Sequence, residues 1–343
     1  MVLLGDGVVS NKRQFPVLIS DCICTHICFD PLREITTDST SQKLLSNGIL
    51  YNKLQTILSG WKSDSIKTKF SCSRKELVDY YCLYSEAMLS SQKEKALVTG
   101  ASSGIGREIA RVLGSQGCDL VITARRKAEL DSLAKELTDS HSIEVKVVVS
   151  DLSEQVGVEN LIRDTGEIDI LVNNAGFGFT GEHLSLNQEG QLNMIDLNIR
   201  ALTHLARHYG AEMKKQGSGK ILNVASIAGY QPGPKMAVYC ATKAYVLSYT
   251  RALHSELKKS GVSVTALCPG FVETGFQEVA GMDLGALELS GAVPAEKVAK
   301  TAVKAMRKGR REVIPGLLNK PIPYANRLIP ISLNLAVVKR LMS

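Results

Sequence analysis

The sequence of 343 residues has few aromatic side chains, 5% in all with a single tryptophan, and it has no long uninterrupted apolar run. A helix that crosses a membrane needs about 20 predominantly apolar residues, so none is expected. The range 1–6 lacks a basic stretch that leads into a sustained apolar run, which argues against a secretory signal. Because aromatic side chains are scarce and no nucleic-acid-binding module is recognisable, nucleic acid is not an expected partner.

The eight cysteines lack the spacing of a disulfide framework, which suits a protein of the cytoplasm. In the range 22–28, three cysteines and a histidine superficially resemble a metal cluster. No second ligand pair follows at the distance typical of a zinc finger, so we expect no metal site. The cysteines after residue 88 fall in strand or helix patterns and are predicted to be reduced core thiols: Cys118, Cys240 and Cys268.

Acidic residues are nearly absent from the C-terminal end of the chain. The range 307–343 holds eight lysines and arginines but one acid, Glu312, and so accounts for the whole net charge of +7. The tail 317–343 is also rich in apolar residues. Such a segment either packs against the domain or a second subunit, which we favour, or makes peripheral contact with an anionic membrane surface.

An orderly alternation of strand and helix patterns begins only near residue 93, and residues 1–87 lack it. We expect one domain over 88–316, because Met88 precedes the first strand pattern by only a few residues. The range 1–87 is either an accessory extension or upstream sequence joined to the true start at Met88, and we favour the second. Some helix is predicted over 75–89.

A glycine-rich loop stands between a short apolar stretch, 95–99, and a helical pattern in which Ile105, Ile109 and Leu113 recur every four residues. Such a loop lets a pyrophosphate approach the backbone. The N-terminus of the helix then offers free N–H groups and the positive end of its dipole. The pattern predicts a dinucleotide site formed by Gly100, Ser102, Ser103, Gly104, Ile105 and Gly106.

The next strand pattern, 119–123, ends without the acidic residue that an NAD site uses to bind the ribose 2′-hydroxyl. Arg125 and Arg126 stand there instead, and a guanidinium can bind a 2′-phosphate through two parallel hydrogen bonds. We therefore expect NADP rather than NAD, with Arg125 as the main contact and Arg126 assisting. The alternative is a solvated pair of arginines that opens the next helix.

Two further apolar stretches, 147–152 and 168–176, are predicted as strands, and Asp151 falls at the C-terminal edge of the first. Strand patterns alternate with helical patterns along the chain, which indicates an α/β fold with a doubly wound parallel sheet of the Rossmann type. Ligands bind such sheets at the C-terminal ends of the strands, where each of these motifs falls.

Tyr239 and Lys243 are four residues apart, which places both on one face of a helix, and Ser226 lies thirteen residues before the tyrosine. The pKa of a free tyrosine is near 10, about three units too high for acid–base catalysis at neutral pH. A neighbouring ammonium group favours the phenolate, so the pair predicts a proton donor with a lowered pKa. Taken alone, the spacing fits an ordinary exposed pair equally well.

In this order and spacing the motifs resemble the short-chain dehydrogenase/reductase family over about residues 93–315. The matching positions are Thr99, Gly100, Gly104, Gly106, 173–176, Ser226, Tyr239, Lys243, Pro269 and Gly270. The resemblance implies that Tyr239 is the general acid and base, and that Lys243 lowers its pKa and holds the nicotinamide ribose. It also implies that Ser226 hydrogen-bonds the substrate oxygen and that Asn198 supports a water in a proton relay.

The resemblance further implies how the cofactor is held. Asp151 would contact the adenine, Asn174 would lie along the ribose, and Thr274, after Pro269 and Gly270, would bind the nicotinamide carboxamide. The cofactor would perform the hydride transfer while the protein supplies orientation and charge.

By the same resemblance the range 271–290 is a mobile lid over the substrate, and it holds four acids but no lysine or arginine. An anionic small substrate would be bound by a cation, so we expect a neutral carbonyl compound or alcohol of apolar or lipid-like character. Five residues beside the catalytic motifs either line this pocket or belong to the core: Phe177, Phe179, Tyr230, Pro232 and Met236.

The sequence thus predicts an NADP-dependent oxidoreductase that interconverts a carbonyl and an alcohol, as a cytoplasmic homo-oligomer. One alternative is a dehydrogenase of a small hydroxy acid or of a ketoacyl thioester, although ketoacyl reductases end soon after a final strand and lack a tail such as 317–343. Another is a catalytically silent protein that senses the dinucleotide. A third is an adaptor that acts at a membrane surface through the tail.

Overall fold

The computed structural model describes residues 93–276, 280–281 and 292–341. The chain divides into two units, and the described residues belong to the second, Lys93–Ser343. The boundary expected at Met88, the helix predicted over 75–89 and the cysteine-rich range 22–28 lie outside the described residues.

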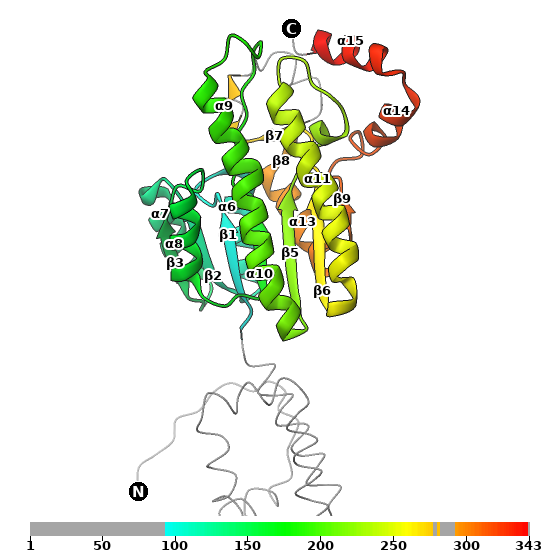
Figure 1. Ribbon diagram of the computed structural model, residues 1–343. Coiled ribbons are helices and arrows are strands. Elements are labelled where there is room, and N and C mark those ends of the chain that lie inside the picture. Colours follow the sequence, from blue (N-terminus) through cyan, green and yellow to red (C-terminus); the bar gives the residue numbers. More distant parts are fainter. Residues whose placement is uncertain (1–92, 277–279, 282–291, 342–343) are drawn as a thin grey trace, which may run out of the picture. The chain divides into compact units, whose positions relative to one another are not determined.

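Seven parallel strands form one sheet in the order β3-β2-β1-β4-β5-β6-β9, with helices on both faces (Figure 1). Two short strands, β7 (Val272–Glu273) and β8 (Val293–Pro294), pair outside this sheet. The strands of the main sheet are β1 Lys95–Thr99, β2 Asp119–Ala124, β3 Val145–Val149, β4 Ile170–Asn173, β5 Gly219–Val224, β6 Val262–Leu267 and β9 Glu312–Val313. The sheet is the doubly wound Rossmann type that the sequence predicts.

Apolar side chains fill both faces of the sheet because successive residues of a strand point to opposite sides. Ala96 and Val98 of β1 pack with one set of helices, and Leu97 packs with the other. Strands covered on both faces are almost continuously apolar, as these are. The first set comprises α6 Gly104–Ser115, α7 Lys127–Ser140 and α13 Ala295–Arg307, and the second includes α8 Gln155–Thr165, α10 Leu202–Gln216 and the end of α11 Ala237–Leu257.

The order of the strands reverses between β1 and β4, which are direct neighbours. The chain runs outward from β1 to β3 and then returns to β4 on the other side of β1. In open α/β sheets, ligands bind beyond the carboxyl ends of the strands at such a reversal. The glycine loop 100–106 and the segment 174–176 begin at this point, after β1 and β4.

Past α13 and β9 the chain continues in two helices, α14 (Ile322–Leu328) and α15 (Ile331–Leu341). They lie at the same end of the domain as α9 (Gln188–Ile195) and the start of α11 (Figure 1). No helix in the described ranges combines the length and the apolar character that crossing a membrane requires. The cysteines of these ranges, Cys118, Cys240 and Cys268, are free and buried, as predicted.

Candidate active site

The glycine loop is folded down onto Asn174. Gly100 and Gly104 have φ of +68° and +56°, the left-handed region that glycine adopts without strain. A Cβ atom at Gly106 would lie 2.3 Å from Nδ2 of Asn174 and 2.4 Å from the Gly100 carbonyl oxygen, so no side chain fits there. The Asn174 amide nitrogen donates to the carbonyls of Thr99 at 2.9 Å and Gly100 at 3.2 Å.

Thr99 connects the two strands at the reversal of strand order. Its hydroxyl donates to the Val172 carbonyl at 3.2 Å and accepts from the backbone N–H groups of Asn174 at 2.9 Å and Ala175 at 3.0 Å. Asn174 and Thr99 therefore hold the loop side by side with the segment after β4. That Asn174 also lies along a cofactor ribose stays a prediction.

Arg126, rather than Arg125, is held over the glycine loop. Its Nη2 atom donates to the hydroxyls of Ser102 at 2.9 Å and Ser103 at 2.7 Å. Arg125 reaches toward Asp151, with Nη1 3.6 Å from Oδ2, and its side chain is 70% exposed. The sequence favours Arg125 as the main contact to a 2′-phosphate, because residue order cannot show which guanidinium turns toward the loop.

Asp151 lies two residues beyond the end of β3, close to where the sequence predicts it. Its Oδ1 atom accepts hydrogen bonds from the backbone N–H of Ser153 at 2.9 Å and from the Ser153 hydroxyl at 2.7 Å. Burial acts to raise the pKa of Asp151, but these hydrogen bonds and the Arg125 guanidinium outweigh it and hold the pKa below its usual range.

Tyr239 and Lys243 are buried, with exposures of 9% and 6%, which excludes the ordinary exposed pair. Tyr239 lies in the first turn of α11 and Lys243 one turn further along. The Lys243 ammonium is 5.8 Å from the centroid of the Tyr239 ring and donates to the Val224 carbonyl at 2.8 Å. The two side chains thus share one face of the helix, as the spacing predicts.

The pKa values of this pair are governed by burial. Burial raises the pKa of Tyr239 above its usual value, and a hydrogen bond with Ser226 only partly offsets the rise. Burial also lowers the pKa of Lys243 to about 8. The prediction of a lowered Tyr239 pKa is therefore wrong for the protein itself, because burial raises this pKa more than the Ser226 hydroxyl lowers it.

Ser226 is brought to Tyr239 by a short turn of 3₁₀ helix, η2 (Ile227–Tyr230). Its hydroxyl oxygen caps this turn by accepting from the Ala228 N–H at 3.1 Å, and the residue is 8% exposed. The same hydroxyl lies 3.5 Å from the Pro269 carbonyl oxygen, after β6. Ser226 and Tyr239 can therefore hydrogen-bond one oxygen atom from two sides.

Asn198 stands within a π-helical segment, η1 (Asp196–Ala201), which connects α9 to α10. Segments of this kind occur often at functional sites. Its amide nitrogen donates to the Phe177 carbonyl at 3.0 Å and to the Thr242 hydroxyl at 3.1 Å. A Cβ atom at Gly176 would lie 2.8 Å from Oδ1 of Asn198 and 3.5 Å from Nζ of Lys243, so the missing side chain leaves these groups room to approach one another.

The segment after β6 returns over the glycine loop. A Cβ atom at Gly104 would lie 3.0 Å from the Thr274 methyl group, which places Thr274 against the loop. Gly270 packs against Asn319, a buried residue of the tail whose Nδ2 donates to the Pro315 carbonyl at 2.9 Å. The sequence does not predict a place for Asn319 at the site, because a single amide after two leucines carries no motif.

Apolar side chains surround Tyr239. The Phe276 ring lies 5.4 Å from the Tyr239 ring, centroid to centroid, and Phe177 and Phe179 meet edge to face. Met236 belongs to the same cluster. Three of the five expected flanking residues therefore border the phenol: Phe177, Phe179 and Met236.

Tyr230 does not belong to this cluster. Its hydroxyl donates to Glu312, which also pairs with Arg251 at 2.6 Å. The Arg251 guanidinium lies 5.4 Å above the Tyr230 ring. This arrangement ties the end of η2 to β9 and α11, so Tyr230 supports the turn that carries Ser226.

A glycine loop at the reversal of a parallel sheet, beside a buried Ser–Tyr–Lys set, defines a nucleotide-binding oxidoreductase of the Rossmann type. Residues 94–284 match the model of the short chain dehydrogenase family, and the chain belongs to that family. Within the described ranges, no group of three or more His, Cys, Asp and Glu side chains could hold a metal ion.

Uncharacterized oxidoreductases of staphylococci are among the relatives. One from Staphylococcus epidermidis is 38% identical over 202 residues, which cover 57% of this chain and 85% of the relative. One from Staphylococcus saprophyticus is 39% identical over 191 residues, which cover 54% of this chain and 82% of the relative. The chain is accordingly an oxidoreductase of this family.

Two solved structures show similar folds. A short-chain dehydrogenase from Sphingobium yanoikuyae in complex with NADPH is 34% identical, with a TM-score of 0.62 over 65% of this chain and 88% of the other. A bulky-bulky ketone specific alcohol dehydrogenase from Comamonas testosteroni is 31% identical, with a TM-score of 0.58 over 65% of this chain and 86% of the other. Both likenesses fit an enzyme that interconverts carbonyl and alcohol groups.

Proposed function

We propose that this protein is an NADP(H)-dependent reductase of neutral, apolar or lipid-like ketones or aldehydes. The observation that carries the proposal is the buried Tyr239 phenol, which lies close enough to the Ser226 hydroxyl for that group to lower its pKa and which is surrounded by apolar side chains. A carbonyl oxygen placed between the two hydroxyls would meet both donors, while the apolar wall would accept the rest of the substrate.

The loop region fits a dinucleotide phosphate. The positive φ of Gly100 and Gly104 turns the loop so that a pyrophosphate can approach its backbone. A side chain at Gly106 would collide with this loop. Arg126 with Ser102 and Ser103 offers a cation and two hydroxyls for a 2′-phosphate. The remaining proposed contacts come from Ile105, Arg125, Asp151, Asn174, Lys243, Pro269, Gly270 and Thr274.

The nicotinamide would supply the hydride that adds to the carbonyl carbon. Negative charge then develops on the carbonyl oxygen, where the hydroxyls of Ser226 and Tyr239 stabilise it by hydrogen bonds. Tyr239 donates its proton to this oxygen, which completes the alcohol. Burial raises the pKa of Tyr239 above its ordinary value, so the phenol carries this proton at neutral pH.

Lys243 would stabilise the phenolate that is left on Tyr239, and a water supported by Asn198 would return a proton to it from solvent. The ammonium group of Lys243 carries its charge below a pH of about 8 and lies 5.8 Å from the ring centroid, so it stabilises the negative charge left on Tyr239. Asn198 holds the neighbouring backbone in place through Phe177. In this proposal these two residues, with Ser226 and Tyr239, form the catalytic set.

The class of substrate, an apolar ketone or aldehyde, is proposed from the side chains around Tyr239. The hydrophobic side chains that pack with Tyr239 in the described ranges are aromatic, methionine, alanine, valine and cysteine, and the Lys243 ammonium lies 5.8 Å from the ring centroid. The similar Comamonas enzyme is named as specific for bulky-bulky ketones, which supports the same class here.

Consumption of NADPH tests the proposal against its alternatives. The full chain is mixed with NADPH or NADH and with bulky apolar ketones, small keto acids or ketoacyl thioesters, and absorbance of the reduced cofactor is followed. We expect consumption with NADPH and bulky ketones. Preference for a keto acid or thioester would replace the substrate class, and binding of NADPH without turnover on any substrate would favour a sensing protein.

A further inference from the structure

The exposed apolar side chains of the described residues are concentrated near the C-terminus. Nine of the fifteen large apolar side chains that are exposed lie between residues 317 and 337. Over residues 331–340 of α15, Asn334 and Val338 are buried and the other side chains are exposed, so most of this part of the helix faces outward. We call the nine residues the C-terminal apolar face: Leu317, Leu318, Tyr324, Leu328, Ile329, Ile331, Leu333, Leu335 and Val337.

Positive charge borders this face and negative charge is absent from its sequence. Lys320, Lys339 and Arg340 are exposed among the apolar residues. After Glu312 the sequence contains no aspartate or glutamate. Exposed apolar side chains gathered in one segment of the chain, together with lysine and arginine in excess, favour an interaction site for an anionic partner.

A second copy of the chain is a poor partner for this face. A two-fold contact brings the same patch of each copy together, so two segments that are rich in Lys and Arg and contain no acid after Glu312 would face each other. An anionic phospholipid surface satisfies both features, because apolar side chains enter the acyl boundary while cations remain at the headgroups. We propose that the C-terminal apolar face docks the protein on an anionic membrane surface.

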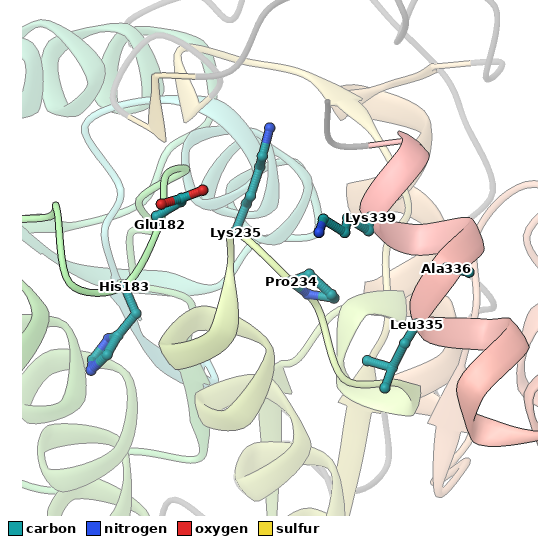
Figure 2. A pocket seen from close by; sticks show the side chains of 7 residues that line it. All are labelled: Glu182, His183, Pro234, Lys235, Leu335, Ala336 and Lys339. Atoms are coloured by element: carbon teal, nitrogen blue, oxygen red, sulfur yellow. The ribbon is translucent and has the colours of Figure 1, made fainter.

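The face also lies beside the substrate side of the domain. A hollow of about 460 Å³ separates α15, which contributes Leu335 and Lys339, from the loop at Pro234 and Lys235 (Figure 2). Lys235, the one non-glycine residue of the described ranges with positive φ, at 66°, lies four residues before Tyr239. A lipid-like ketone leaving the membrane would meet this hollow first, a link that rests on the proposed function.

Co-sedimentation of the full chain with vesicles tests the docking without cofactor or substrate. Vesicles of phosphatidylcholine alone are compared with vesicles that also contain phosphatidylserine. We expect binding to the anionic vesicles, weakened at least tenfold in the double variant Leu318→Glu, Leu328→Glu. A matched double variant at exposed apolar positions elsewhere, Val156→Glu, Leu192→Glu, should bind as the unmodified protein does.

The charges are tested in the same way. Lys320→Glu with Arg340→Glu should weaken binding at least tenfold at low salt, and this difference should shrink as salt screens the surface. Lys258→Glu with Lys259→Glu, in the short helix η3 (Lys258–Ser260), is the control and should have a smaller effect. Thermal midpoints of all variants should stay near that of the parent, because each position is exposed.

Three results would overturn the proposal: absence of binding to anionic vesicles, equal binding by the face and control variants, or a concentration-dependent dimer that Leu318→Glu, Leu328→Glu abolishes. Consumption of NADPH with a water-soluble ketone is measured separately on the same proteins. NADPH consumption without vesicle binding would contradict the docking proposal and leave the proposed function standing. Vesicle binding without NADPH consumption on any substrate would contradict the proposed function and leave the docking proposal standing.

Discussion

Asn198 and Phe177 form a closed pair of hydrogen bonds, in which the Asn198 side chain donates to the Phe177 carbonyl at 3.0 Å and accepts from its N–H at 3.2 Å. Asn198 is 1% exposed, so water cannot replace either bond. This pair fixes the π-helical segment η1 against the strand end that carries Gly176, and thereby sets the position of the proposed catalytic residues around that glycine.

Replacing Asn198 with Leu should destabilise the protein, because the Phe177 N–H and carbonyl would be left buried without partners. We expect a loss of about 2–4 kcal/mol, and so a thermal midpoint lower by at least about 5 °C. Asn193→Leu, on the preceding helix at a half-buried position, is the control and should shift stability by less than about 1 kcal/mol. Equal midpoints for the two variants would contradict this account of Asn198.

Gly106→Ala should disrupt the cofactor loop, because its Cβ would lie 2.4 Å from the Gly100 carbonyl oxygen and 2.3 Å from Nδ2 of Asn174. Gly210→Ala offers a matched helical glycine, since its Cβ would meet Ile221 and Leu257 at an ordinary 3.6 Å. Thermal unfolding should show Gly210→Ala to be more stable by about 0.5–1 kcal/mol, while Gly106→Ala loses stability and NADPH affinity. Unchanged NADPH affinity in Gly106→Ala would show that the loop tolerates a side chain.

Cofactor preference should depend more on Arg126 than on Arg125, because only Arg126 is held by Ser102 and Ser103. Fluorescence titration should show Arg126→Ala weakening NADPH at least tenfold and NADH about twofold or less, with a smaller NADPH effect for Arg125→Ala. Adding Ala124→Asp should improve NADH binding by restoring an acceptor for the 2′-hydroxyl. Equal losses for both cofactors would place the 2′-phosphate elsewhere.

Lys243 should make stability depend on pH in a defined direction. Its folded pKa of about 8 lies below the usual value of 10.5, so the unfolded chain binds more protons between these values and the stability of the folded state rises with pH there. The advantage of Lys243→Met over the parent should therefore be largest near pH 7 and shrink by about 2 kcal/mol by about pH 9.5. A constant difference across this range, measured by denaturant unfolding, would contradict a buried charged lysine.

The sequence predicts the parts of this molecule that depend on local pattern. Alternation of apolar stretches with helical periodicity is enough to predict the parallel sheet, because strands covered on both faces must be apolar. The spacing of Tyr239 and Lys243 likewise predicts a shared helix face. Features that depend on contacts across the fold were not predicted.

Arg126, Tyr230 and Asn319 illustrate that limit. Arg126 turns to serines 24 and 23 residues away, and Tyr230 turns to Glu312, 82 residues away. Asn319 reaches Gly270 only because the tail folds back over that segment. The direction of the Tyr239 pKa shift was predicted wrongly for a related reason, since the degree of burial is a property of the packed fold rather than of sequence spacing.

Turnover of Tyr239→Phe is the most direct test of the central claim, that the Tyr239 hydroxyl delivers the proton in carbonyl reduction. The variant keeps the ring and its packing against Phe276 but has no transferable proton. Single-turnover consumption of bound NADPH with a reactive ketone should fall at least about a hundredfold, while the dissociation constant of NADPH changes by less than about twofold. Near-normal turnover in this variant would contradict the mechanism.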